Sequence, residues 1–363
     1  MRKLVSIQRI SKLEVIPGAD KIELATVKGW KVIVQKGLHR ENDLVAFCEP
    51  DSFLPIDKRY EFLHKSGYKK TVNLGEGYRV KIMKMRGQVS QGLILPLSDL
   101  HELEDVEIGD LLGIQKYEKP IPVHLKGKIR GNFPDFVRKT DEERAQNLLK
   151  EINEHIEKKT LFEASIKLDG SSMTVYVKED SRLGPILETV GVCSRNWDLD
   201  EETDSMDGPG RASKNAFWTC AREQALVDSI KVAKECLGHD LAFQGELMGP
   251  GVQDNRENIL GFDFYLYHIW DINEQRYLSP VERKNLLLAL SKRRYHVNHV
   301  PVLGVFSLDT ICKPHSIIDD LTKYADRPSL NKEIAAEGVV FKAMDSDFSF
   351  KIINASFLLE EKD

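Results

Sequence analysis

The feature that most constrains the fold is a change in the pattern of apolar residues near residue 118. Before that point, short apolar runs are separated by turn residues, which predicts strands at 29–35, 44–48, 78–83 and 92–96. Short strands at this spacing favour a small β-barrel, and we expect an OB-like barrel over residues 1–118. From residue 161 onward, strand-like and helix-like segments mix, which indicates an α+β domain.

Length and composition agree with a division into two domains. A chain of 363 residues with 41% hydrophobic and 30% charged residues is typical of a globular protein of this size. Residues 119–139 are rich in proline and glycine, and they hold six Lys and Arg against one Asp. We therefore predict a basic linker at 119–139 and a second domain at 140–363.

The sequence also indicates where the protein works. No apolar run approaches the ~20 residues that a membrane-spanning helix needs. The five cysteines are odd in number, and none has C-x-x-C spacing. We expect a reduced, intracellular and cytoplasmic protein with no structural zinc site, no membrane association and no obligate protein partner.

One segment of the first domain is strongly basic. Residues 58–86 carry nine Lys and Arg against two Glu, although the whole chain has a net charge of −5. Tyr60, Phe62, Tyr68 and Tyr78 are interleaved with these charges. Cations alternating with aromatic rings suit a nucleic-acid backbone with stacked bases, so we predict nucleic-acid binding. The alternative is a solvated, charged loop.

Three helices are predicted in the second domain. Thr140 to Glu143 has the pattern of a capping box, which predicts a helix that starts there and runs to Lys159. A second helix is expected over 213–237. A third should start at Ser279, where Pro280 and Glu282 complete another capping box.

The segment 161–170 alternates between apolar and polar residues and predicts a strand. The apolar face holds Phe162, Ala164, Ile166 and Leu168, and the polar face holds Glu163, Ser165, Lys167 and Asp169. Asp169-Gly170 is a turn signal, so we predict a hairpin whose return strand includes residues 173–177. Lys167 and Asp169 then lie side by side at a strand end.

A lysine in this position can act as a nucleophile once its amine is deprotonated. Burial or nearby positive charge favours the neutral amine, whereas a nearby carboxylate opposes it unless a divalent metal neutralises the carboxylate. This reasoning favours a role for Asp169 in binding Mg²⁺ or its water shell. The alternative is an exposed strand with a tight turn.

Four later segments share this character. They are a glycine-flanked carboxylate around Glu246, an aromatic strand at 264–272, a strand from Glu337 to Lys342, and an alternating strand around Lys351. Together with the lysine strand, they resemble in type and order the motifs of the covalent nucleotidyltransferases, over residues 140–354. This superfamily comprises polynucleotide ligases and capping enzymes with an ATP-grasp-like mixed antiparallel sheet.

Within the superfamily, the chain is similar to ATP-dependent RNA ligases with an N-terminal OB domain (type 5). The segments Thr140–Asn147 and Cys193–Asn196 carry this similarity. Domain order supports it, because only twelve residues follow Lys351, too few for the OB domain that follows the last lysine motif in DNA ligases and capping enzymes.

The resemblance implies a three-step reaction with ATP and Mg²⁺ or Mn²⁺. Lys167 would attack the α-phosphorus of ATP and become lysyl-AMP. AMP would pass to the 5′-phosphate of an RNA, and a 3′-OH end would then displace it. Such a reaction reseals broken RNA, so the resemblance implies a role in RNA repair.

The resemblance also implies site residues. Asp169, Glu246 and Glu337 would surround the metal, largely through its waters. The nucleotide would contact the remaining candidates, which are Arg144, Arg195, Asn196, Glu246, Trp270, Lys342 and Lys351. Trp270 would stack on adenine, although a core aromatic is the alternative and His268 is a rival. Many relatives have a second lysine where this chain has Ser349, so the source of the second positive charge is open.

Two other functions stay open at this point. Ligation of DNA uses the same lysine chemistry, and a non-catalytic nucleic-acid-binding relative would keep the fold. The joint presence of Lys167, Asp169, Glu246, Glu337 and Lys351 argues against the second of these.

Overall fold

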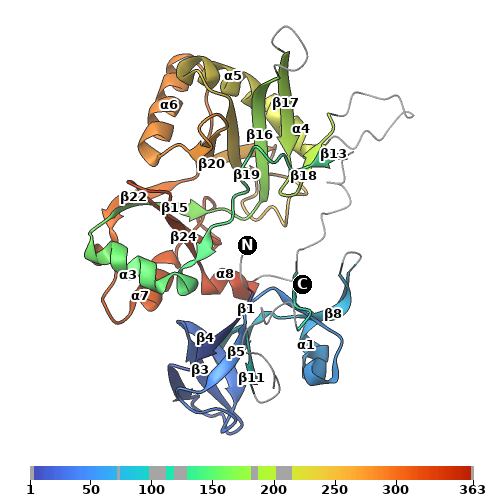
Figure 1. Ribbon diagram of the computed structural model, residues 1–363, viewed down its shortest axis with the longest axis vertical. Helices are drawn as coiled ribbons and strands as arrows, with labels where there is room; N and C mark the ends of the chain where they lie inside the picture. The colour runs from blue at the N-terminus through green and yellow to red at the C-terminus, as the bar shows by residue number, and fades with distance from the viewer. Residues whose placement is uncertain are drawn as a thin grey trace. The chain divides into compact units, whose positions relative to one another are not determined.

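The computed structural model describes residues 4–71, 74–97, 112–117, 129–180, 187–201 and 215–360 (Figure 1). The chain divides into two compact units. Unit 1 holds Met1–Pro120, Ala145–Leu149 and Leu358–Asp363, and unit 2 holds Ile121–Arg144 and Lys150–Phe357. Strands and helices make an α+β protein, as the sequence predicted. Within the described residues, no helix is long and apolar enough to cross a membrane.

Unit 1 is built mostly of short strands. They are β1 (Val5–Arg9), β2 (Lys12–Val15), β3 (Ile22–Val27), β4 (Trp30–Gln35), β5 (Leu44–Cys48), β6 (Ser52–Pro55), β7 (Tyr68–Thr71), β8 (Gly75–Arg79), β9 (Ile82–Met85), β10 (Gln88–Gln91), β11 (Leu93–Pro96) and β12 (Gln115–Lys116). A 3₁₀ helix η1 (Lys58–Leu63) and a short helix α1 (His64–Gly67) separate β6 from β7.

These strands form small sheets with the orders β1-β5-β11, β2-β3-β4, β12-β6-β8-β7 and β10-β9. The predicted strands at 29–35, 44–48 and 92–96 match β4, β5 and β11. The predicted strand at 78–83 is wrong. Its apolar alternation is continuous, but two strands cover this range. β8, which pairs with β6, ends at Arg79, and β9, which pairs with β10, begins at Ile82.

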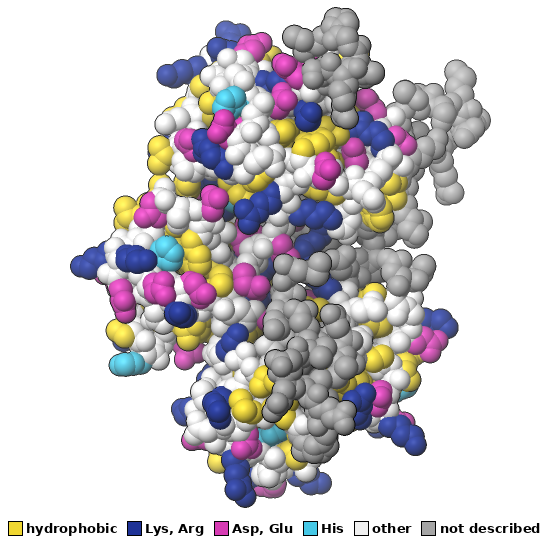
Figure 2. Space-filling view, viewed as in Figure 1, with side chains coloured by type: hydrophobic (Ala, Val, Ile, Leu, Met, Phe, Trp, Pro, Cys, Tyr) yellow, Lys and Arg dark blue, Asp and Glu magenta, His cyan; other side chains and the backbone are white. Residues whose placement is uncertain are grey.

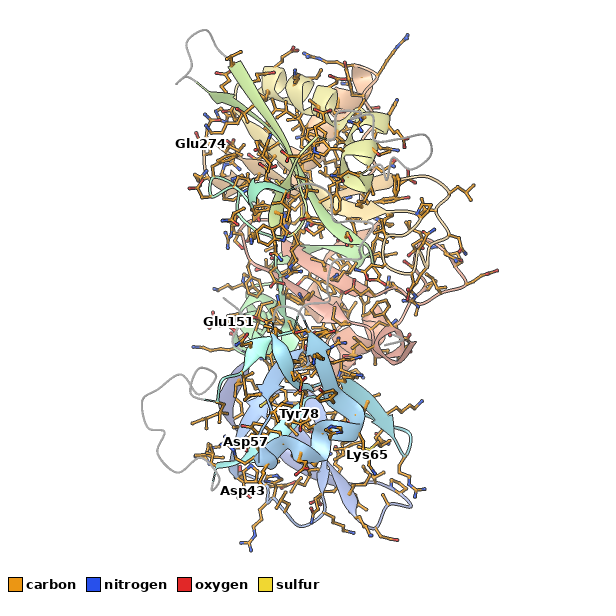
Figure 3. The ribbon with its side chains drawn as sticks, turned by 90° about the vertical axis from the view of Figure 1, so that its right-hand side faces the viewer. Asp43, Asp57, Lys65, Tyr78, Glu151 and Glu274 are labelled. Atoms are coloured by element: carbon orange, nitrogen blue, oxygen red, sulfur yellow. The ribbon has the colours of Figure 1, made fainter. Side chains whose placement is uncertain are left out.

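Buried aromatic side chains hold unit 1 together. One cluster packs around Trp30 and Phe47, and another around Tyr60 and Tyr78, all at most 3% exposed. Tyr78 is labelled in Figure 3. The face shown in Figure 2 mixes Lys and Arg with acidic side chains, and its hydrophobic side chains lie in small separate patches.

Unit 2 contains two larger sheets. Their strands are β13 (Ile129–Asn132), β14 (Glu143–Arg144), β15 (Leu161–Lys167), β16 (Ser171–Asp180), β17 (Leu187–Cys193), β18 (Trp197–Leu199), β19 (Leu241–Met248), β20 (Asp263–Asp271), β21 (Arg276–Tyr277), β22 (Val302–Ser307), β23 (Gly338–Ala343) and β24 (Ser349–Ile353). The seven-stranded sheet has the order β13-β18-β17-β16-β19-β20-β21, and the five-stranded sheet has the order β14-β24-β23-β15-β22.

The predicted hairpin after Lys167 is wrong. β15 pairs with β22 and β23, whereas β16 pairs with β17 and β19 of the other sheet. The chain therefore crosses from one sheet to the other between Lys167 and Ser171. Local turn signals cannot reveal this, because they do not specify which strands pair. The crossing places Lys167 where both sheets can supply neighbours.

The helices that follow residue 144 are η4 (Ala145–Asn147), α3 (Leu149–Glu157), α4 (Ala216–Glu223), α5 (Leu226–Leu237), α6 (Pro280–Lys292), η6 (Leu308–Thr310), α7 (Ile317–Ala325) and α8 (Ala355–Glu360). α5 packs on β16 and β19, where Ile230 and Phe243 are fully buried in a shared core (Figure 1). Across the other sheet, Arg283 of α6 forms a buried ion pair with Glu163 of β15.

The helix predictions have mixed outcomes. α6 begins as predicted, with the capping box between Ser279 and Glu282 in place. The helix predicted over 213–237 is two helices, because Ala225 adopts a left-handed conformation between them (φ 48°); residues 213 and 214 lie outside the described part.

The capping box predicted at Thr140 is wrong. The segment forms strand β14 and η4 before α3 starts at Leu149. The Thr140 hydroxyl instead lies 3.2 Å from the Tyr267 hydroxyl. The tertiary contact replaces the local cap that the sequence pattern suggested.

The second half of the predicted linker is part of unit 2. Ile129–Asn132 forms β13 at the edge of the seven-stranded sheet, and Arg130 forms an ion pair with Asp198 (2.6 Å). Residues 119–128, the rest of that linker, lie outside the described residues.

Candidate active site

Lys167 is the last residue of β15, and the strand register determines its nearest neighbour. Lys167 lies opposite Gly338, the first residue of β23, so Glu337 directly precedes the paired position. The Lys167 Nζ lies 2.6 Å from the Glu337 Oε2. Their side chains are 25% and 18% exposed, so water reaches the pair only partly.

Glu246 approaches the same place from β19, in the other sheet. Its Oε1 accepts a hydrogen bond from the Gly170 backbone N–H at 3.1 Å. A Cβ on Gly170 would lie 2.4 Å from the Leu247 carbonyl oxygen, so a side chain here would force the two strands apart. Glycine is therefore required for the crossing segment to reach β19 this closely.

Electrostatic coupling joins these groups into one cluster. Burial acts to lower the pKa of the Lys167 amine, but the negative charges of Glu337, Glu246 and Asp169 outweigh it and raise that pKa above its ordinary value. Burial raises the pKa of Glu246 to about 8; Lys167 opposes this rise, while Glu337 and Asp169 add to it. The resting amine is therefore protonated and not nucleophilic.

The donor set of this cluster fits a divalent cation. Asp169, Glu246 and Glu337 all act on the charge of a single ammonium group. Burial is the main cause of the raised pKa of Glu246, and the charges of Glu337 and Asp169 add to it. Carboxylate oxygens are the ligands that Mg²⁺ and Mn²⁺ prefer. Within the described part of the chain, no three His, Cys, Asp or Glu side chains already form a metal-binding group.

A second group of charged side chains lies along β24 and β14. The Lys351 Nζ is 3.2 Å from Asp141 Oδ1, and an Arg195 guanidinium nitrogen is 3.4 Å from Asp141 Oδ2. Burial lowers the pKa of Lys351, and the charge of Lys167 adds to that effect while Asp141 opposes it. The structure therefore brings Lys351 and Arg195 to the same carboxylate, with Lys351 close enough to Lys167 to sense its charge.

Arg144 lies beside Lys351. The two residues are paired in the parallel register of β14 and β24, and Arg144 is 7% exposed. A second positive charge is thus present next to Lys351, although the first lysine of the last motif is replaced by Ser349. Asn196 follows Arg195 in the chain, and its side-chain oxygen accepts a hydrogen bond from Lys139 (3.3 Å).

Lys342 has a different environment from the one predicted. It is 5% exposed, and its Nζ donates to the backbone oxygen of Tyr267 at 2.5 Å. Burial, together with the charge of Arg283, lowers the pKa of Lys342 to about 7. The amine therefore ties β23 to β20, and the structure does not bring it into contact with the Lys167 cluster.

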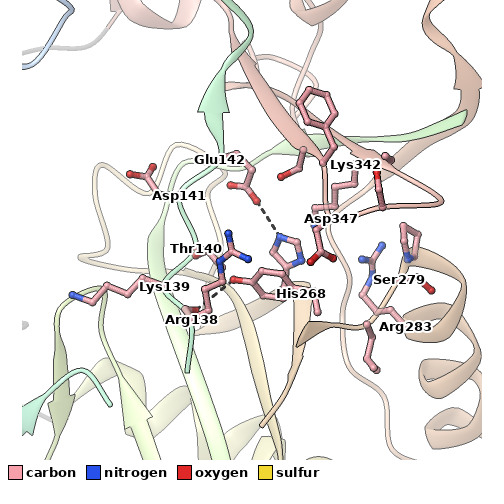
Figure 4. Close-up of a pocket in the computed structure, with 17 residues that line it drawn as sticks. Arg138, Lys139, Thr140, Asp141, Glu142, His268, Ser279, Arg283, Lys342 and Asp347 are labelled. Atoms are coloured by element: carbon pink, nitrogen blue, oxygen red, sulfur yellow. Dashed lines mark hydrogen bonds and ion pairs between the residues drawn. The ribbon is translucent and has the colours of Figure 1, made fainter. Parts of the chain in front are cut away.

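A pocket lies beside this amine (Figure 4). Its lining includes Arg138, Glu142, His268, Arg283 and Lys342. The His268 Nε2 is 3.0 Å from Glu142 Oε1, and burial lowers the pKa of His268 to about 4. His268 is therefore a neutral, buried residue of this network.

Trp270 is a core residue in the structure. It is 4% exposed, its Nε1 donates to the Phe136 carbonyl oxygen at 3.0 Å, and its ring meets the edge of Tyr277 at 4.9 Å. The alternative interpretation of Trp270 as a core aromatic describes this position. The predicted stacking role would need the ring to leave its packing.

Tyr267 is the aromatic residue that faces the cluster. The register of β19 and β20 pairs Gln244 with His268 but Gly245 with Leu266, so Tyr267 forms a β-bulge. Bulges redirect side chains at functional sites. The Tyr267 hydroxyl lies 3.2 Å from the Ser172 hydroxyl, and burial with the charge of Glu246 raises its pKa.

Comparisons with known proteins agree with this geometry. A family model of RNA ligases matches residues 161–353, and a model of an OB-fold domain matches residues 4–97. The chain belongs to the RNA ligase family. A search of curated proteins finds no match.

Solved structures of Naegleria gruberi RNA ligase are similar over the whole chain. A lysine-to-methionine mutant with AMP and Mn is 39% identical, with a TM-score of 0.85 and 98% of each chain covered. A glutamate-to-alanine mutant with ATP and Mn is 38% identical, with a TM-score of 0.85 and 100% of each chain covered. The enzyme with PPi is 38% identical, with a TM-score of 0.84 and coverage of 99% of this chain and 98% of that one.

Two residues that contact the candidate site were missed from the sequence. Asp141 was treated as part of a capping box, and its contacts with Lys351 and Arg195 span long sequence separations. Tyr267 could have been found as an aromatic residue of the 264–272 strand. Strict alternation, however, gives no way to place the bulge.

Proposed function

We propose that this protein is an ATP-dependent RNA ligase that joins RNA 3′-OH and 5′-phosphate ends through a lysyl-AMP intermediate. The observation that carries this proposal is the cluster at the sheet crossing. One lysine amine lies 2.6 Å from Glu337, with Glu246 and Asp169 close enough to shift its pKa. The Naegleria relatives, crystallised with ATP, AMP and Mn, support the choice of nucleotide and metal.

The first step forms a bond between the Lys167 Nζ and the α-phosphorus of ATP and breaks the bond to pyrophosphate. The amine must first lose a proton, and Glu337 Oε2 is placed to hold it. A divalent cation bound by Asp169, Glu246 and Glu337 would supply positive charge that lowers the pKa of the amine and stabilises phosphate charge. The protein otherwise contributes positioning.

Lys351 and Arg195 would bind the phosphates of the nucleotide. Both cations now contact Asp141, a carboxylate that occupies the position an anionic phosphate would take. Arg144, beside Lys351, would add the second positive charge. Asn196 would contribute a carboxamide after release from Lys139.

Tyr267 would stack on adenine in place of Trp270. The bulge directs Tyr267 toward Ser172 and Thr140, and Lys342 holds its backbone oxygen. A flat aromatic face is suited to a purine ring. Lys342 would then influence nucleotide binding only through the position of Tyr267.

The two later steps transfer AMP to the 5′-phosphate and then join the ends. In the second step of the reaction, an oxygen of the RNA 5′-phosphate attacks the phosphorus of lysyl-AMP and the lysine amine leaves. In the third, the RNA 3′-oxygen attacks the 5′-phosphorus and AMP leaves. Each step develops charge on phosphate oxygens, which the cations of this site would stabilise. Sealing of broken RNA would make this a repair enzyme.

Covalent labelling tests the proposal. Protein is incubated with α-³²P-ATP or α-³²P-GTP and Mg²⁺ or Mn²⁺, and label is followed on denaturing gels. Lys167→Ala should abolish the ATP-dependent label, whereas Lys158→Ala, an exposed lysine at the end of α3, should retain it. Label that persists in Lys167→Ala would exclude this nucleophile.

A substrate comparison tests the choice of RNA. Nicked duplexes that differ only in ribose or deoxyribose at the 3′-OH end should be sealed at different rates, with ribose preferred. Equal sealing of both, or faster sealing of deoxyribose ends, would favour the alternative function of a DNA ligase. Absence of label in the wild-type protein would favour a non-catalytic relative.

A further inference from the structure

Unit 1 exposes an aromatic surface that the nucleotide chemistry does not use. It consists of Phe62 at the end of η1, His64 and Lys65 of α1, Tyr68 at the start of β7, and Lys58 at the start of η1. All five side chains are exposed. Phe62 is 62% exposed and Tyr68 is 36% exposed, so both rings are accessible from solvent.

Packing beneath this surface fixes the rings. The His64 and Tyr68 rings are stacked, with centroids 4.9 Å apart and planes inclined by 23°. Both meet the edge of Tyr78, at 6.2 and 6.4 Å, and Tyr78 is buried in the barrel. The stacked pair is therefore held on a rigid support, and one further ring could extend the stack with little loss of side-chain entropy.

Charge next to the rings favours an anionic partner. Residues 57–76 carry five Lys and Arg against three acidic residues, whereas the whole chain is at −5. Arg59 pairs with Asp57 (2.9 Å) and Lys70 pairs with Glu76 (2.8 Å). Each pair uses one cation and one carboxylate, so the segment keeps its excess of two positive charges. Figure 2 shows Lys and Arg side chains together with hydrophobic and some acidic ones at the lower right edge, where Figure 1 places α1. Lys65, labelled in Figure 3, extends from this helix.

We propose that this surface binds a single-stranded segment of the RNA substrate, with bases stacked on Phe62 and on the His64–Tyr68 pair and with phosphates contacted by Lys58 and Lys65. Exposed aromatic faces accept any base, and flanking cations follow the backbone. A duplex keeps its base faces inside its own stack, so it cannot use the rings in this way. The inference rests on the proposed RNA ligase function and deepens it by assigning where RNA outside the reacting ends is held.

The test compares two double variants of unit 1. Phe62→Ala with Lys65→Ala removes one exposed apolar side chain and one exposed lysine from the surface. Leu38→Ala with Lys36→Ala removes the same two kinds of side chain after β4 and serves as the matched control. Binding of a fluorescent 12-nucleotide oligouridylate to the full chain is measured by anisotropy, and labelling by ATP is measured on the same preparations.

The surface variant should bind oligouridylate roughly 10-fold or more weakly, since base stacking on an aromatic residue contributes about 1–3 kcal/mol. Its affinity should also depend less on salt, because one phosphate contact is lost. The affinity of the control variant for oligouridylate should stay within about 2-fold of the wild-type value, because the control loses no ring on which a base could stack. Both variants should keep wild-type labelling by ATP. A further variant, Phe62→Trp, should retain binding, because it keeps a flat ring.

Three outcomes would overturn the proposal. The surface and control variants could bind equally well, the loss could be equal for a blunt RNA duplex, or Tyr68→Ala could bind as tightly as Tyr68→Phe. The proposed ligase chemistry is judged separately. If wild-type protein took no label from ATP yet the surface variant still lost oligouridylate binding, the catalytic proposal would fail and the RNA surface would stand.

Discussion

Lys342 offers the sharpest test of how burial controls charge in unit 2. This side chain is 5% exposed, and its pKa is lowered from 10.5 to about 7, chiefly by burial and then by Arg283. In the unfolded chain the amine holds its proton up to the ordinary value. Between pH 7 and 10.5 the unfolded state therefore binds one more proton than the folded state, and stability rises with pH through this window.

The perturbation is Lys342→Met, which keeps the length of the side chain and removes the titrating group. Each pH unit inside the window is worth about 1.4 kcal/mol, so the wild type should gain about 2–3 kcal/mol on the variant between pH 7 and 9. Loss of the hydrogen bond to Tyr267 adds a constant difference of about 1 kcal/mol that does not change with pH. The slope therefore isolates the buried amine.

Urea unfolding at pH 7, 8 and 9 measures this slope for the wild type, for Lys342→Met and for the exposed control Lys158→Met. The control should run parallel to the wild type. A constant difference between the wild type and Lys342→Met across the three pH values would refute the reasoning. A fall in the stability of the wild type relative to Lys342→Met as pH rises would also refute it, because the folded protein would then prefer the charged amine.

Three further outcomes follow from contacts in unit 2. Glu163→Gln should lower stability by about 3–5 kcal/mol in urea unfolding, because it leaves Arg283 charged and buried without its partner; a change below about 1 kcal/mol would contradict this. Tyr267→Ala should raise the ATP concentration needed for half-maximal labelling at least about 10-fold, whereas Tyr267→Phe should stay near wild type, and equal values would remove Tyr267 from the nucleotide site. Trp270→Phe should reduce thermal stability with little change in that ATP concentration, and the reverse pattern would restore Trp270 as the stacking residue.

The sequence predicted features that depend on local pattern. The strand that ends at Lys167 and the capping box of α6 involve neighbouring residues only, and both are present. The order of the segments along the chain also predicted the architecture, an OB-like domain followed by an α+β domain that begins with the lysine strand. These features need no knowledge of which strands pair.

Features that depend on pairing between distant strands could not be predicted. Asp169-Gly170 has the composition of a hairpin turn, yet Gly170 serves for close approach to Leu247 of another sheet. Thr140 has the composition of a helix cap, yet its hydroxyl contacts Tyr267. In both cases a tertiary contact uses the same small or polar residue that a local motif would use, so the pattern alone is ambiguous.

The same reasoning applies to Lys342 and Lys351, which are both candidate nucleotide contacts in the sequence although their surroundings differ. In the five-stranded sheet, Lys342 lies opposite Glu163 and Ser349, whereas Lys351 lies opposite Val340 and beside Arg144. On β23, Lys167 lies opposite Gly338. Lys351 lies opposite Val340, which is nearer to Gly338 than Lys342 is, so Lys351 is the lysine closer to Lys167. Register, which the sequence does not state, separates the two lysines.

In the resting protein, carboxylates neutralise the cations that the proposed reaction would use. Glu337 holds the Lys167 amine, and Asp141 holds Lys351 and Arg195. Under the proposed function, a nucleotide phosphate, which carries more negative charge than a carboxylate, would replace Asp141 beside Lys351 and Arg195. The amine is different, since its raised pKa keeps it protonated until the charge on the surrounding carboxylates is offset. We therefore expect substrate binding and activation of Lys167 to be controlled by different acidic residues. A change at Asp141 should alter the first, and a change at Glu337 should alter the second.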